Sequence, residues 1–306
     1  MGSARQDGHS HAVGVHADRR YLVIALALLV AFMVGEVVVA FASGSLALLS
    51  DAGHMLSDVG AIVAALWAMR LAAREASGPW TFGWKRAEIL SAAGNGATLL
   101  VVSGVIGLEA VRRLVHPPEV EGGPVIVVAL VGVAVNLLAT WALSRANRTS
   151  LNVEGAYQHI LTDLYGFVGT VVAGVVIVTT GWTRADPIAS LLVVALMLRA
   201  GWGLLRDSGR VLLEAAPEAI DLDHVRQHLR SNEHVVDVHD LHVWSVTSDL
   251  PTLSVHVVLD DSCFHDGHAP KILDDLQACL TGHFDVEHST FQLEPSSHAP
   301  HEPGTH

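Results

Sequence analysis

Two pairs of metal-ligand residues share one spacing in this sequence. His54 is followed four residues later by Asp58, and His159 is followed four residues later by Asp163. Positions i and i+4 of a helix lie on one face, so each pair would present an imidazole nitrogen beside a carboxylate oxygen. Two such helices facing each other offer two nitrogens and two oxygens, which suits tetrahedral Zn²⁺ at about 2.0–2.2 Å. Cd²⁺ and Co²⁺ accept similar ligands, whereas Cu(I) favours thiolates and Mg²⁺ favours oxygen alone.

The elements that carry these pairs are predicted to span a membrane. The chain of 306 residues is 51% hydrophobic and only 16% charged, where a typical soluble domain is about one quarter charged. A helix needs about 20 apolar residues to cross the hydrocarbon core of a bilayer. Six segments meet or approach that length, at residues 21–41, 46–71, 89–111, 124–143, 155–180 and 188–205.

Ionisable groups inside membrane spans are costly, and they are therefore functional candidates. Of the 19 histidines in the chain, only His54 and His159 fall within the predicted spans. One His–Asp pair alone would be better explained by a hydrogen bond that fixes helix packing. Two pairs of identical spacing on separate spans favour a metal site. Glu36 and Asn136 are other polar residues in the spans, and we interpret them as packing or pathway groups.

The distribution of Lys and Arg predicts the orientation of the chain in the membrane. With the N-terminus in the cytoplasm, the inside segments hold twelve Lys and Arg residues and the outside segments hold three. Cytoplasmic loops carry the excess of these residues in membrane proteins. Six spans then place both termini in the cytoplasm. Compact loops favour a bacterial inner membrane as the location of this multi-pass protein.

The C-terminal part of the chain has a different character. Residues 1–211 hold 15 Lys and Arg against 14 Asp and Glu, whereas residues 212–306 hold 3 against 17, a balance of −14. This acidity argues against nucleic-acid binding, which needs basic patches, and favours cations. Its hydrophobic pattern predicts helices at 221–230 and 271–281, and strands at 235–246, 252–260 and 288–294.

The expected fold is a six-helix transmembrane bundle followed by a cytoplasmic α-β-β-α-β domain. We assign residues 19–211 to the bundle and 212–295 to a cytoplasmic metal-binding regulatory domain. Residues 1–18 and 296–306 are polar and contain histidines, and we expect both to be disordered.

Several segments resemble one transporter family, the cation diffusion facilitators, and its zinc-transporting branch in particular. These segments are residues 44–58 (GSLALLSDAGHMLSD), 82–88 (FGWKRAE), 159–163 (HILTD) and 238–244 (VHDLHVW). The resemblance covers about residues 15–295. It implies six transmembrane helices, a metallochaperone-like (ferredoxin-like) cytoplasmic domain, a homodimer, and exchange of metal for protons.

The resemblance also implies roles for individual residues. His54, Asp58, His159 and Asp163 match the family's transport site. In the cytoplasmic domain the matching metal-binding candidates are His239, His256, Glu294, His242 and His268. Arg86 and Glu214 lie where the family often has a salt bridge.

The predicted function is export of Zn²⁺ from the cytoplasm in exchange for protons by alternating access, with Zn²⁺ also a regulatory ligand. Binding to histidine competes with protons, because a metal ligand must be deprotonated. An intramembrane metalloprotease would need a His-Glu-x-x-His motif, and the sequence contains none. We therefore expect no enzyme activity. The alternative is a membrane zinc sensor or scaffold that does not transport.

Overall fold

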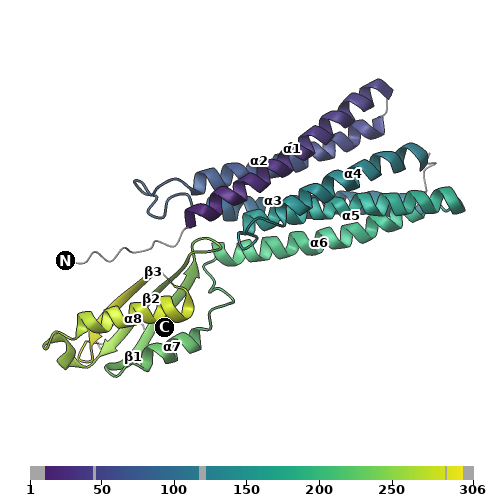
Figure 1. Cartoon of the computed structure of the whole chain (residues 1–306). Helices are drawn as coiled ribbons and strands as arrows, with labels where there is room; N and C mark the ends of the chain where they lie inside the picture. Colours follow the sequence, from purple (N-terminus) through teal and green to yellow (C-terminus); the bar gives the residue numbers. More distant parts are fainter. Residues whose placement is uncertain (1–10, 44–45, 117–121, 287, 299–306) are drawn as a thin grey trace. The chain divides into compact units, whose positions relative to one another are not determined.

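The computed structural model describes residues 11–43, 46–116, 122–286 and 288–298 (Figure 1). The side chains at positions 11–18, 42, 43, 46–51, 53, 54, 57 and 122–125 lie outside this description. The chain divides into two compact units, residues 1–208 and 209–306. Six long helices make up most of the first unit, and they are α1 (His11–Ser43), α2 (Leu46–Ala72), α3 (Ala87–Val115), α4 (Gly122–Leu143), α5 (Leu151–Thr180) and α6 (Ala185–Leu212).

The surface of this helical unit is apolar, as expected of helices in lipid. Large hydrophobic side chains are exposed along the helices, among them Trp67, Val101, Leu108, Trp141 and Leu192. Patches of this extent are rare on soluble monomers. Among the described residues, five helices are long and apolar enough to cross a bilayer, namely α1 and α3 to α6. The sixth expected span is α2, which packs against α1, α3 and α5 and has several positions outside the described side chains.

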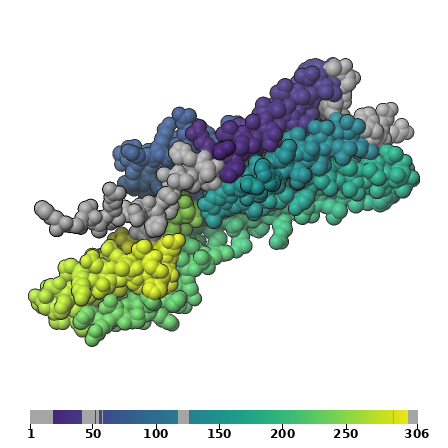
Figure 2. All heavy atoms as spheres, viewed as in Figure 1, coloured from purple at the N-terminus to yellow at the C-terminus, as the bar shows by residue number. Residues whose placement is uncertain are grey.

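Small residues and one buried amide set the distances between the helices. Helices α3 and α6 cross at Gly96 and Gly201, where a Cβ on either glycine would lie 3.0 Å from the carbonyl oxygen of the other. Small residues allow such close backbone approach between membrane helices. The buried Asn152 side chain on α5 donates a hydrogen bond of 3.0 Å to the carbonyl oxygen of Ala65 on α2. Figure 2 shows α1 and α4, which also pack together, side by side on one face.

The second unit has the predicted order α-β-β-α-β. Helix α7 (Leu222–Arg230) begins at Asp221, whose carboxylate accepts hydrogen bonds from the backbone N–H groups of Asp223 and His224. It is followed by β1 (Val235–Ser245), β2 (Pro251–Leu259), the short 3₁₀ helix η1 (Asp261–Phe264), α8 (Ala269–Phe284) and β3 (His288–Pro295). The strand order is β1-β2-β3, with β1 antiparallel and β3 parallel to β2.

One face of this sheet carries the hydrophobic core. The core is built from alternate residues of β2, including Leu253, Val255 and Val257, together with apolar residues of α7 and α8. Both helices therefore cover the same face. His256 lies between core residues of β2, so its side chain belongs to the opposite face, as its alternation with them predicts.

The two expected disordered ends differ from the structure in part. Helix α1 begins at His11, so residues 11–18 continue it rather than form a free tail, while residues 1–10 lie outside the described residues. At the other end, Ser296 and Ser297 donate hydrogen bonds to the carboxylate of Asp261. The Ser297 N–H and the Ser296 hydroxyl lower the pKa of Asp261. The chain is thus held as far as His298, and residues 299–306 are outside the description.

We predict that Gly201→Leu destabilises the helical unit, because its side chain would collide with the Gly96 carbonyl at the crossing of α3 and α6. Overpacking of this kind costs about 1–3 kcal/mol, and thermal unfolding of the purified protein in detergent would show a lower midpoint. Gly203→Leu is the matched control, since a Cβ at Gly203 meets no atom within 4 Å. Equal midpoints for both variants would contradict the proposed crossing.

Candidate metal transport site

Helices α2 and α5 bring two of the predicted ligands into contact. The Nε2 atom of His159 lies 2.7 Å from a carboxylate oxygen of Asp58, although the residues are 101 positions apart. His159 is only 4% exposed. A buried imidazole against a partly buried carboxylate is costly unless the groups are paired or bind an ion. The two His-x-x-x-Asp helices therefore face each other at this point.

Asp163 adds a second carboxylate to the group. It lies one turn after His159 on α5, and one ligand atom from each of Asp58, His159 and Asp163 falls within 4.8 Å of the others. Tetrahedral zinc ligands lie about 3.5 Å apart, so small side-chain rotations suffice to enclose an ion. The fourth predicted ligand, His54, lies on α2 one turn before Asp58, and its side chain is outside the described residues.

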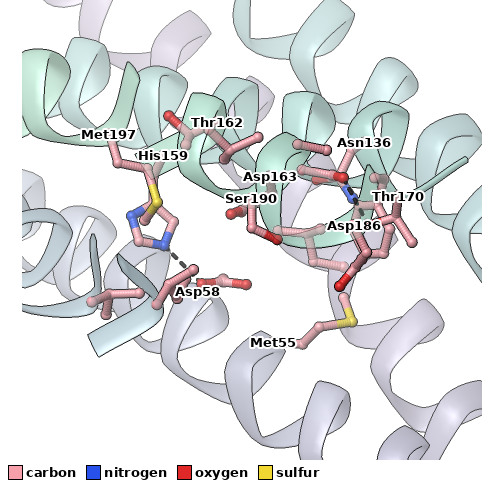
Figure 3. Close-up of a pocket in the computed structure, with 17 residues that line it drawn as sticks. Met55, Asp58, Asn136, His159, Thr162, Asp163, Thr170, Asp186, Ser190 and Met197 are labelled. Carbon is pink, nitrogen blue, oxygen red and sulfur yellow. Dashed lines mark hydrogen bonds and ion pairs between the residues drawn. The ribbon is translucent and has the colours of Figure 1, made fainter. Parts of the chain in front are cut away.

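A cavity of about 240 Å³ surrounds these ligands (Figure 3). All six helices of the unit contribute side chains to it, from Leu29 on α1 to Met197 on α6. Its polar lining consists of Asp58, Asn136, His159, Thr162, Asp163, Thr170, Asp186 and Ser190. The cavity thus places a cluster of polar side chains among apolar walls, within a bundle that is apolar outside.

Asp186 and Ser190 were not predicted from the sequence. Both lie in the first turns of α6 and line the cavity with Asp163. The hydropathy pattern placed the start of the sixth span at residue 188, which excluded Asp186 from the intramembrane residues. The sequence did contain one signal for Asp186, since it is a carboxylate directly before a long apolar segment. Asn136, interpreted as a packing or pathway group, also lines the cavity, and its side chain donates to the Gly132 carbonyl.

The donor set fits a divalent cation of borderline softness. One imidazole nitrogen and two carboxylates are ligands that Zn²⁺ accepts. Carboxylates this close repel each other unless a cation or a proton lies between them. The Nδ1 atom of His159 is buried and makes no hydrogen bond to any residue that the structure describes. Such an atom is the position where a metal-bound histidine takes an orienting partner or a water.

A second group of ligands lies on the open face of the sheet in the C-terminal unit. Glu294 is 2% exposed and its carboxylate contacts both neighbouring histidines, at 2.8 Å from Nδ1 of His256 and 3.5 Å from Nε2 of His239. His239 and His256 are paired residues of β1 and β2, and their rings lie 5.1 Å apart. Three of the five predicted cytoplasmic ligands are thus brought together.

Asp240 is a further candidate that the sequence did not reveal. His239, Asp240 and His256 offer ligand atoms within 4.8 Å of one another. Neighbouring residues of a regular strand point to opposite faces, which argues against such a pair. A β-bulge lies between His239 and His242, with Asp240 at a φ of 47°. The bulge therefore allows consecutive residues to serve one site.

The remaining predicted residues lie apart from these groups. His242 is exposed on β1 opposite Ser254, and His268 pairs with Asp266 at 3.0 Å. The structure places neither in the group around Glu294. Arg86 directly precedes α3 in the first unit, and Glu214 belongs to the second unit. Their salt bridge stays a prediction.

Comparison with known proteins identifies the class of this site. The model of the cation efflux transmembrane domain matches residues 22–213, and the model of the cation efflux protein cytoplasmic domain matches residues 217–296. The chain belongs to the cation efflux family. This agrees with the predicted resemblance, and the family consists of transporters rather than enzymes.

Bacterial members of the cation efflux family align with almost the whole chain. The cadmium, cobalt and zinc/H(+)-K(+) antiporter of Bacillus subtilis is 39% identical over 95% of this chain and 93% of its own length. The zinc transporter ZitB of Escherichia coli is 41% identical over 90% of this chain and 88% of its own. A solved structure of the metal-bound C-terminal domain of the CzcD transporter is 35% identical, covers 24% of this chain and 99% of that one, and has a TM-score of 0.22.

The ligands His239, Asp240, His256 and Glu294 are called the sheet-face group below. We predict that Asp240→Asn weakens zinc binding at this group by about 10-fold or more, because a charged ligand is replaced by a neutral amide. Calorimetric titration of the full-length protein with Zn²⁺ would measure this. His242→Ala, on the same strand but outside the group, should leave the affinity unchanged. The reverse ranking of the two variants would show that His242, not Asp240, serves the site.

Proposed function

We propose that this member of the cation efflux family exports Zn²⁺ from the cytoplasm in exchange for protons, and that Asp58, His159, Asp163 and His54 bind the ion in transit. The observation that carries the proposal is the convergence of Asp58, His159 and Asp163 in a cavity lined by all six helices. The names of the relatives from Bacillus subtilis and Escherichia coli support zinc as cargo, with cadmium and cobalt as further candidates.

The chemistry of the ligands couples transport to protons. His159 and the two carboxylates must lose their protons before they bind Zn²⁺. When the cavity opens to the proton-rich side, protons compete for the same atoms and the ion is released. The contact of 2.7 Å between His159 and Asp58 supports this exchange, because two side chains this close can share a proton or a hydrogen bond. A site without a thiolate also helps release, because soft sulfur ligands would bind zinc more tightly.

The setting of this cycle is the inner membrane of a bacterium, with both termini and the C-terminal unit in the cytoplasm. The excess of Lys and Arg in the predicted inside segments supports this orientation. The protein acts as a homodimer in this proposal. Two acidic C-terminal units, each with a formal charge of −14 over residues 212–306, repel each other, and Zn²⁺ bound near His239, His256 and Glu294 lowers that repulsion. Zinc is thereby a regulatory ligand as well as the cargo.

The transport site is tested by Zn²⁺ uptake into proteoliposomes driven by an imposed pH gradient. We predict that Asp163→Asn and His159→Gln each lower uptake at least about 100-fold, since even outer-shell changes at metal sites cost about 10- to 100-fold. Asp186→Asn, which removes a carboxylate from the cavity lining rather than from the ligand group, should cause a smaller loss. Collapse of the pH gradient should stop uptake by the wild type.

Asp207→Asn is the matched control for these variants, because Asp207 is exposed near the other end of α6. It should transport as the wild type does. Wild-type uptake by Asp163→Asn would overturn the assignment of the site. A wild-type protein that binds Zn²⁺ but moves neither zinc nor protons would instead support the sensor or scaffold alternative.

The regulatory role is tested by the distance between spin labels on the two C-terminal units of the dimer. We predict that Zn²⁺ shortens this distance in the wild type and does so less in Glu294→Gln, which weakens the carboxylate between the two histidines. Asp163→Asn, changed only in the membrane, should respond as the wild type does. A distance that is indifferent to zinc would contradict the regulatory proposal and leave the transport proposal standing.

A further inference from the structure

A third group of metal-ligand side chains lies on the helical side of the C-terminal unit. His228 on α7 and Cys279 and His283 on α8 offer ligand atoms that lie within 4.8 Å of one another. The rings of His228 and His283 are 4.6 Å apart. Cys279 and His283 are one turn apart on α8, so both project from one face of that helix. Two helices therefore contribute to one group.

This group is separate from the ligands around Glu294. Helices α7 and α8 cover the core face of the sheet, whereas His239, His256 and Glu294 contact one another on the other face. The core lies between the two groups, so one ion cannot occupy both. Helix α8 lies at the surface of its unit in Figure 2, and His283 is exposed, which gives an ion from solvent direct access.

The geometry of His283 prepares it to bind a metal. Its Nδ1 atom lies 3.1 Å from the backbone carbonyl oxygen of Cys279, and a carbonyl at that distance accepts a hydrogen bond from the ring. This fixes the tautomer in which Nε2 carries the free lone pair. Metal-bound histidines commonly donate their other ring nitrogen in this way. The partner that orients the imidazole is thus the backbone of the residue that supplies the sulfur.

We propose that His228, Cys279 and His283 bind a thiophilic divalent ion, Zn²⁺, Cd²⁺ or Co²⁺, at a site distinct from both the membrane site and the sheet-face group. Two imidazoles and one thiolate select these borderline ions over Mg²⁺, Ca²⁺ and Mn²⁺. A fourth position is left to water, because His283 faces solvent. Three protein ligands and an open position make an exchangeable site rather than a closed structural one.

Binding at this site requires the loss of a proton from sulfur. A metal ion displaces that proton and forms the bond to the thiolate. The affinity of the site should therefore increase with pH. The acidic balance of residues 212–306 raises the local concentration of cations around it.

The test uses Co²⁺ as the probe, because a thiolate bound to Co²⁺ gives an intense charge-transfer absorption that nitrogen and oxygen ligands do not. The chain has two cysteines, and Cys263 is buried in the core at 1% exposure. We predict that the full-length protein in detergent shows the thiolate band on Co²⁺ addition. Cys279→Ser should abolish the band, and His228→Ala and His283→Ala should each weaken Co²⁺ affinity by at least about 10-fold.

Cys263→Ala and His256→Ala are the matched controls, since one removes the other thiol and the other removes a sheet-face ligand. Both should keep the band, and zinc transport should be retained in Cys279→Ser. Absence of the band in the wild type at saturating Co²⁺, or its persistence in Cys279→Ser, would overturn this inference. Either result leaves the membrane transport site untouched, because that site contains no cysteine.

Discussion

The contact between His159 on α5 and Asp58 on α2 is the constraint around which the helical unit is organised. A buried imidazole lies beside partly buried carboxylates, and ionisable groups of this kind are stable inside a bundle chiefly when they are paired or bind a cation. The surrounding helices form a cavity in which polar side chains gather around these groups. Its lining from all six helices keeps charged atoms inside while the apolar side chains face outward.

The C-terminal unit also holds a buried carboxylate beside histidines, but on a β-sheet rather than between helices. Glu294 is buried, yet it contacts His239 and His256 from neighbouring strands. A carboxylate between two imidazoles holds the histidines close together before any ion arrives. The bulge at Asp240 then brings a second carboxylate to the same place. The membrane group and the sheet-face group therefore combine histidine with carboxylate, but one is enclosed by helices and the other lies at the surface of a sheet.

Local patterns predicted the elements well and the sites in part. Hydropathy and the i, i+4 spacing identified the spans and the pairing of α2 with α5, and strand alternation placed His256 opposite the core. Asp240 could not be predicted, because a bulge breaks the alternation on which the inference depends. Asp186 was excluded by a boundary two residues too late. His228 meets Cys279 and His283 only through the packing of α7 and α8, which no local spacing reveals.

Two contacts between α2 and α5 share one register. His159 meets Asp58, and Asn152 meets Ala65, so a step of seven residues backward on α5 matches a step of seven forward on α2. The helices are thus antiparallel and are joined by two side-chain contacts that lie about two helical turns apart. Sliding one helix along the other would break both contacts at the same time. A change of access that preserves both contacts must therefore move α2 and α5 together as one pair.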